Sequence, residues 1–176
     1  RGLTVDTENI YVGLDEIILI YVTGNHIGKE VEIIVKDSQG KIITQENSTF
    51  STYIPNLDGT SARLVLKNLD AGEYTVDAIY IEVNGTKIIE HKGNGIFEVM
   101  KLPSELMIKE ITNITVGENV TIELELDPNT ATGNISVFVN GIEHKTNTSS
   151  LVITIPNLGA EEYSVHAFYY GDNNYF

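Results

Sequence analysis

The chain has 176 residues, enough for one large domain or two small ones with a buried core. Apolar residues make up 41% and charged residues 20%, which excludes an intrinsically disordered chain, and no apolar run is long enough to span a bilayer. Asp and Glu (25) outnumber Lys and Arg (11), and the formal charge of −14 argues against binding to nucleic acids or anionic membranes.

The residue types favour an all-β protein. Ile, Val and Thr, whose branched side chains suit a pleated and half-buried surface, supply 55 of the 176 residues. The absence of Cys excludes disulfides, thiolate zinc sites and cysteine nucleophiles. The chain begins at Arg1 without a targeting segment, so we expect a processed protein or a piece of a longer one.

The first part of the chain alternates apolar and polar residues in short runs separated by turn residues. Alternation with a period of two places one face of a strand in the core and the other in water. Strands are predicted near residues 17–23, 30–37, 41–47, 61–68, 73–83 and 95–100. No amphipathic helical pattern separates them, so we expect antiparallel sheets rather than parallel βαβ units.

A short linker around Pro103 follows these strands. Proline cannot donate to a sheet ladder and restricts the preceding residue to extended conformations, so a domain boundary is predicted here. The next residues, 104–111, are also compatible with a weak helix. Further strands are predicted at residues 120–126, 135–139, 151–155 and 163–169. The pair Asn140-Gly141 predicts a two-residue hairpin turn, since both residues must accept a positive φ.

An internal repeat divides the chain into two related parts. Residues 69–80 recur as residues 158–169, and residues 10–13 recur as residues 114–117. We therefore predict an all-β fold of two tandem immunoglobulin-like antiparallel β-sandwich domains, residues 1–101 and residues 102–176.

A tyrosine in each repeat supports the immunoglobulin-like type. In such domains a Tyr near the start of the sixth strand donates a hydrogen bond back across the preceding corner. Tyr74 and Tyr163 occupy that place, each two residues before an apolar position. The alternative interpretation is an ordinary core aromatic with a solvated hydroxyl group.

The second domain is expected to lack its last strand. Domain one closes with residues 96–99, predicted to pair beside the Tyr74 strand, whereas domain two stops at Tyr175-Phe176. The unpaired edge would be completed by more of the parent chain or by a strand from a neighbouring subunit. Residues 3–12 of the next copy are the suggested donor, which would give a head-to-tail polymer.

Four motifs of the second domain occur in a characteristic order. They are Val116-Gly117-Glu118-Asn119-Val120-Thr121, Val139-Asn140-Gly141, Ile155-Pro156-Asn157-Leu158 and Gly171-Asp172-Asn173-Asn174-Tyr175. As a set they resemble the bacterial-type immunoglobulin-like repeats of the large adhesin-like surface proteins of methanogenic archaea. The match covers most of residues 104–176 and, more loosely, residues 2–100. The resemblance implies an extracellular stalk or display role without catalysis or a cofactor, and it carries over no binding residues.

Six Asn-x-Ser/Thr motifs give partly independent support for an extracellular, glycosylated protein. They contain Asn47, Asn84, Asn113, Asn119, Asn134 and Asn147. Chance predicts roughly two such matches at this composition. Part of the excess follows from the enrichment of Thr in strands and Asn in turns.

Catalysis has little support in the sequence. The four histidines are scattered, and neither a nucleophile elbow nor a phosphate-binding loop is present, so we expect no enzyme and no organic cofactor. A calcium site is a weaker possibility, because carboxylates from loops at the two facing domain ends would supply the hard oxygen ligands that Ca²⁺ requires. Its candidate ligands are Asp15, Asp70, Asp127 and Asp172. The alternative is a set of solvated acidic turns.

Three functions remain open. The first is a structural and adhesive module, a stalk or repeat segment of an adhesin-like surface protein, whose partners are other copies, neighbouring repeats, cell-surface glycans or another cell. The second is a self-assembling, pilus-like filament subunit that uses strand donation. The third is a carbohydrate-binding accessory module, for which Phe168 and Tyr170 on one outer strand face are the nearest aromatic platform. The favoured alternative for these two residues is that they cover the adjacent sheet edge.

Overall fold

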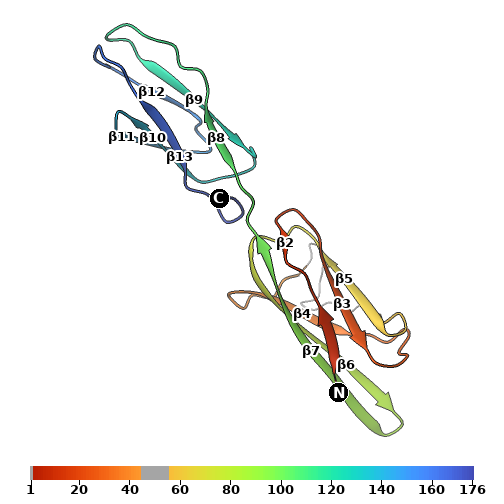
Figure 1. Cartoon of the computed structure of the whole chain (residues 1–176). Helices are drawn as coiled ribbons and strands as arrows, with labels where there is room; N and C mark the ends of the chain where they lie inside the picture. Colours follow the sequence, from red (N-terminus) through yellow and green to blue (C-terminus); the bar gives the residue numbers. More distant parts are fainter. Residues whose placement is uncertain (1, 45–55) are drawn as a thin grey trace. The chain divides into compact units, whose positions relative to one another are not determined.

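The computed structural model of the protein describes residues 2–44 and 56–176. In these two ranges the chain forms strands and no helix, so the all-β prediction is confirmed. The described residues accordingly contain no helix long and apolar enough to cross a membrane. Residues 104–111, for which a weak helix was considered, instead contain strand β8. The chain divides into two compact units, Arg1–Met100 and Lys101–Phe176, one residue before the predicted boundary (Figure 1).

Unit 1 contains two sheets. One has the order β1-β3-β5, and the other has the order β2-β7-β6-β4. The strands are β1 (Leu3–Asp6), β2 (Ile10–Tyr11), β3 (Glu16–Val22), β4 (Glu32–Asp37), β5 (Ser61–Leu66), β6 (Gly72–Asn84) and β7 (Lys87–Met100). All neighbours pair antiparallel except β2 and β7, which run parallel.

The two sheets of unit 1 share one core. Alternate residues of β3 point inward, so Ile18 and Ile20 are fully buried and pack with Ile33 of β4 and Val76 of β6. Each aliphatic side chain buried in this way contributes about 1.5–3 kcal/mol of transfer free energy. Glu16, on the inward face of the same strand, is also completely buried.

Unit 2 contains two three-stranded sheets, with the orders β12-β9-β8 and β11-β10-β13. The strands are β8 (Glu105–Ile108), β9 (Val120–Asp127), β10 (Asn134–Val139), β11 (Ile142–Asn147), β12 (Val152–Ile155) and β13 (Val165–Tyr169). The inward residues of β9 and β10, among them Ile122 and Val137, form its core. Strand β13 is an edge strand, whereas β6, which carries the matching repeat, has a neighbour on each side.

Several strand predictions agree with the structure, and others differ at the ends. The predicted hairpin turn is confirmed, because Asn140 and Gly141 both have positive φ and join the antiparallel strands β10 and β11. Strand β7 begins at Lys87 rather than near residue 95, and β13 begins at Val165 rather than at residue 163. Of the strand predicted near residues 41–47, only an isolated bridge at Ile42 is present in the described part, and residues 45–47 lie outside it.

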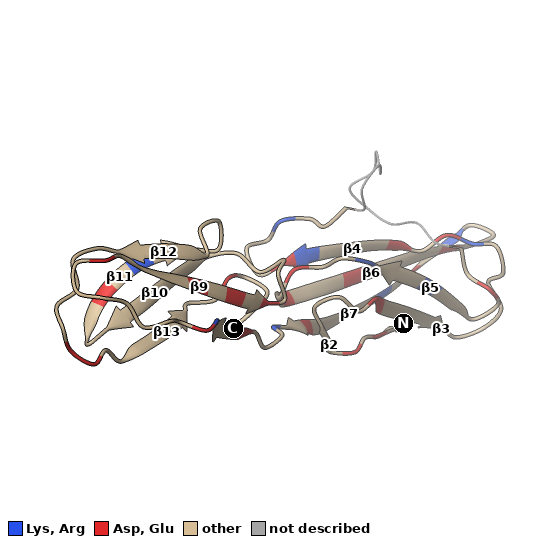
Figure 2. Ribbon diagram, turned by 90° about the horizontal axis from the view of Figure 1, so that it is seen from above, with Lys and Arg blue, Asp and Glu red and all other residues tan. Residues whose placement is uncertain are grey.

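Charged residues are spread over both units. Figure 2 shows Asp and Glu along strands and loops of each unit, with fewer Lys and Arg.

Candidate functional site

The last strand of unit 1 shows which two neighbours a strand has at this position of the fold. Strand β7 lies between β2 and β6: Val99 pairs with Ile10 on one side, and Phe97 pairs with Tyr74 on the other. The rings of Phe97 and Tyr74 stack with centroids 5.0 Å apart and planes 5° apart. Both side chains are buried, so this strand closes one side of the core.

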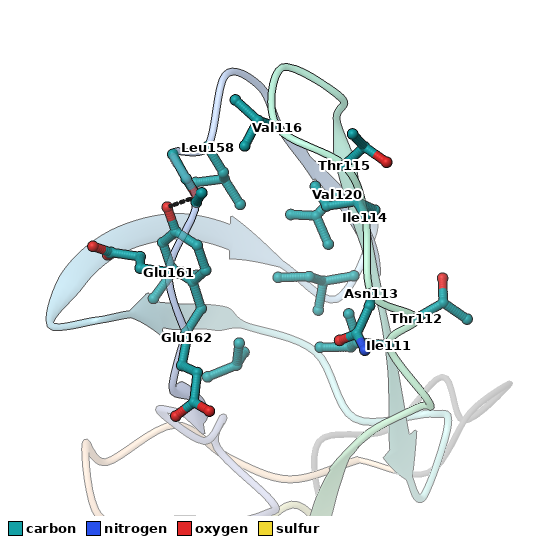
Figure 3. A pocket seen from close by; sticks show the side chains of 16 residues that line it. Ile111, Thr112, Asn113, Ile114, Thr115, Val116, Val120, Leu158, Glu161 and Glu162 are labelled. Atoms are coloured by element: carbon teal, nitrogen blue, oxygen red, sulfur yellow. Dashed lines mark hydrogen bonds between the residues drawn. The ribbon is translucent and has the colours of Figure 1, made fainter.

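In unit 2 the same place is a groove of about 600 Å³ (Figure 3). The internal repeat matches Ile10 with Ile114 and Tyr74 with Tyr163. Ile114 and Tyr163 belong to opposite walls of the groove. One wall is residues 111–116 and the other is residues 158–165; Val120, Ile122 and Val139 of the core also line it. Among the described residues, no strand lies between the two walls.

The matched residues of the two units differ in exposure, as expected if unit 2 has no strand at the position of β7. Tyr74 and Val76 are 5% and 0% exposed, whereas the matching Tyr163 and Val165 are only partly buried. The segment around Ile114 is nevertheless held in place, because the Glu118 amide donates to the Thr115 carbonyl at 3.0 Å. The matching bond in unit 1, from Leu14 to Tyr11, measures 3.1 Å. The turn that follows this wall of the groove is therefore the same as the turn that follows β2 in unit 1.

The predicted tyrosine positions have matching hydrogen bonds in both units. The Tyr74 hydroxyl donates to the Asp70 carbonyl at 2.5 Å, and the Tyr163 hydroxyl donates to the Gly159 carbonyl at 2.9 Å (dashed in Figure 3). Burial, reinforced by the nearby charges of Asp70 and Asp37, raises the pKa of Tyr74. The preceding corner also repeats, since Asn68 and the matching Asn157 both adopt φ near +57°.

Sequence reasoning identified one wall of the groove and missed the other. The sequence predicts an unpaired edge on the strand that contains Tyr163, but it does not predict the parallel pairing of Ile10 with Val99. The signal was present in the recurrence of residues 10–13 as residues 114–117, which places Ile114 where a last strand would pair.

Two of the candidate calcium ligands, Asp172 and Asp15, have other partners in the structure. The Asp172 carboxylate accepts hydrogen bonds from the amides of Thr132, Asn174 and Tyr175 at 2.7–2.9 Å. Its burial alone would raise the pKa of Asp172, but these amide bonds outweigh burial and lower the pKa. Asp15 lies 4.0 Å from the Lys67 ammonium.

No three His, Asp or Glu residues converge on a possible metal position within residues 2–44 and 56–176. A calcium site shared by loops of both domains, with Asp70 and Asp127 among its ligands, stays a prediction.

The glycosylation candidates differ in how far the structure describes them. The side chains of five candidates are exposed to solvent: Asn84, Asn113, Asn119, Asn134 and Asn147. Asn47 lies outside the described residues. Asn113 belongs to a wall of the groove. Glycosylation at the six positions stays a prediction.

The aromatic pair proposed as a sugar platform lies on the outer face of the β11-β10-β13 sheet. Phe168 and Tyr170 are 55% and 54% exposed, and their rings meet edge to face with centroids 4.8 Å apart. The Tyr170 hydroxyl donates to the Ser136 hydroxyl at 3.0 Å, and Ser136 donates to Glu143 at 2.7 Å. A shallow depression next to Tyr170 is lined by these polar groups and by Lys145.

Comparison of the sequence with family models and with curated proteins finds no match. The fold is similar to a Ca²⁺-stabilized adhesin that helps an Antarctic bacterium reach out and bind ice, with 11% identity, a TM-score of 0.37 and coverage of 99% of this chain and 48% of that one. It is also similar to a DUF4785 family protein from Legionella pneumophila, with 13% identity, a TM-score of 0.40 and coverage of 97% and 46%. The chain thus spans just under half the length of each structure. At this distance neither similarity assigns a function or a calcium site to this chain.

Proposed function

We propose that this chain is a non-enzymatic, extracellular structural and adhesive module of a cell-surface protein. In this proposal its units are tandem immunoglobulin-like sandwiches, and unit 2 is completed by an added β-strand. The observation that carries the proposal is the groove between residues 111–116 and 158–165, at the position that β7 fills in unit 1. A fold with one sheet edge open beside its core is suited to joining other polypeptide segments by strand addition.

Other features support the sandwich type and the extracellular setting. Each unit has two sheets around one core and a corner tyrosine bonded to the carbonyl four residues earlier, as in immunoglobulin-like domains. The five described Asn-x-Ser/Thr asparagines are exposed, and the acidic charge keeps such a module soluble. The ordered motifs of residues 104–176 resemble the repeats of adhesin-like proteins of methanogenic archaea, which supports a surface location.

Strand complementation within one chain tests this function. A copy of residues 95–101 is appended after Phe176 through a flexible loop of about five residues, enough to reach back along the open edge of β13. We expect the melting temperature of unit 2 to rise by at least about 5 °C, because Phe97 and Val99 of the copy cover the exposed core. A matched chain whose copy carries Asp at both positions is the control. Equal melting temperatures in the two chains would contradict the proposal.

A filament of copies joined by strand donation is a second candidate, favoured by the same groove. The suggested donor, residues 3–12, is engaged in its own unit: β1 pairs with β3, and Leu3 is 5% exposed. Donation would therefore require release of β1 from its own sheet. Sedimentation over a hundredfold range of concentration tests this candidate, since a filament grows with concentration and a chain with a retained β1 stays monomeric.

A carbohydrate-binding module is the third candidate, favoured by Phe168 and Tyr170 beside the Ser136–Glu143 network. Exposed aromatic rings stack on the apolar faces of sugars, and neighbouring hydroxyl and carboxylate groups bond their hydroxyls. Glycan-array binding that is lost in Tyr170→Ala, with unit 2 still folded, would support this candidate. Absence of binding to every glycan would remove it.

A further inference from the structure

We propose that the groove of unit 2 binds an extended peptide strand in one direction and one register. The strand runs antiparallel to β13 and parallel to residues 114–115, and its sequence carries an aromatic residue followed two positions later by a β-branched one. This inference rests on the proposed function, and it specifies the partner of the same groove.

The direction follows from the two walls. In unit 1 the strand between the matching walls is antiparallel to β6 and parallel to β2. A peptide in the opposite direction would replace the evenly spaced, slanted bonds beside Ile114 with the paired bonds of an antiparallel ladder. The turn after this wall is the same in both units, because the Glu118 amide donates to the Thr115 carbonyl as the Leu14 amide donates to the Tyr11 carbonyl, and this supports the same parallel arrangement beside residues 114–115.

The register follows from the pairs in unit 1. Because Phe97 pairs with Tyr74 and Val99 pairs with Ile10, the aromatic residue of the bound strand is placed opposite Tyr163 and the β-branched residue opposite Ile114. The aromatic ring then stacks on Tyr163 as Phe97 stacks on Tyr74. A shift by one residue would point both apolar side chains to solvent.

Charge at the rim distinguishes the preferred partner from β7 itself. Glu162 matches Glu73, which pairs with Glu98 in unit 1, so a copy of β7 would place a second carboxylate opposite Glu162. Glu161 lies beside it, and both glutamates are exposed at the groove. A basic residue between the aromatic and β-branched positions makes a favourable cross-strand pair instead, and like charges there are unfavourable. The expected partner thus reads aromatic-basic-β-branched.

The test uses the complete 176-residue chain and synthetic peptides of residues 93–101. One peptide has the natural sequence, one has Glu98→Lys, and one has the Glu98→Lys sequence reversed as a control. By NMR, the Glu98→Lys peptide should shift signals of residues 111–116 and 158–167. It should also bind about two- to fivefold more tightly than the natural sequence, the effect expected of one cross-strand charge pair. The reversed peptide should bind at least tenfold more weakly.

Register is measured by disulfide trapping, because the chain has no Cys of its own. The Ile114→Cys chain is mixed under oxidising conditions with peptides carrying Cys at the Val99 or the Glu98 position, since paired strands bring Cα atoms within disulfide reach. The Val99 position should cross-link at least fivefold faster.

Equal cross-linking at the two positions, equal binding of the reversed peptide, or no binding by the unmodified chain would each overturn the inference. If the appended copy of residues 95–101 stabilises unit 2 while the free peptides fail, the proposed function stands and this inference alone falls. If the appended copy also has no effect, both fall.

Discussion

The two corner tyrosines allow one site to be compared with and without a neighbouring last strand in the same molecule. Tyr74 and Tyr163 donate to carbonyl groups at matching positions, but Tyr74 is 5% exposed and Tyr163 is only partly buried. We predict that Tyr74→Phe costs unit 1 about 1–1.5 kcal/mol, the usual cost of removing a buried hydrogen bond. Tyr163→Phe should cost unit 2 less than about 0.5 kcal/mol, because water reaches the released carbonyl.

Filling the groove should raise the cost at Tyr163. In a chain carrying the appended copy of residues 95–101, the ring of Tyr163 is covered, and Tyr163→Phe should then cost about 1 kcal/mol, corresponding to about 4–8 °C for a unit of this size. Urea unfolding followed by NMR signals of each unit separates the two costs.

Two results would refute this reasoning. Equal costs at Tyr74 and Tyr163 in the unextended chain would mean that the groove does not leave Tyr163 exposed to water. Neutral substitutions at both sites would remove the corner assignment altogether.

Three further predictions concern single positions. Glu16→Val, which copies the matching Val120, should stabilise unit 1 by about 1 kcal/mol at pH 7, because Glu16 is completely buried and its Oε2 has no hydrogen-bond partner in the described structure. Burial raises the pKa of Glu16, so wild-type stability should fall as pH rises through that raised value, and the variant should lack this slope in urea titrations. Asp172→Asn should cost unit 2 about 1 kcal/mol of stability at pH 7. Because the pKa of Asp172 is lowered, the contribution of its carboxylate is present above the ordinary Asp pKa and is lost as the pH falls through the lowered pKa, which acid unfolding would show. Gly93→Ala should destabilise unit 1 by about 1–3 kcal/mol in thermal unfolding, because a Cβ there would overlap the Leu3 carbonyl oxygen.

Strands with a clean period-two pattern were predictable from the sequence. Ile18, Ile20 and Val22 alternate with more exposed residues, and β3 covers almost the residues expected. The first half of β7 was missed because its Gly and charged residues lack such a pattern, and its pairing with β6 comes from the continuous hairpin. The strand β8 pattern is ambiguous because its four residues are too few to separate a helical period from a strand period.

The groove was half predictable for a related reason. The repeat around Tyr163 showed that a partner strand was expected, since residues 96–99 follow the matching motif in unit 1. The opposite wall depends on a parallel pair of only two residues, Ile10 and Tyr11, which leaves almost no local signal. Burial of Glu16 was also unpredictable, because a charged residue at the end of a strand is more often solvated.

Residue-resolved hydrogen exchange of the 176-residue chain tests the strand-accepting groove most directly. We predict strong protection of the Tyr74 and Val76 amides, because β6 is paired on both sides, and at least about a hundredfold faster exchange at Tyr163. Adding the Glu98→Lys peptide of residues 93–101 should slow exchange at Tyr163 and at residues 114–116 without changing Tyr74. Protection of Tyr163 equal to that of Tyr74 before any peptide is added would contradict an open groove.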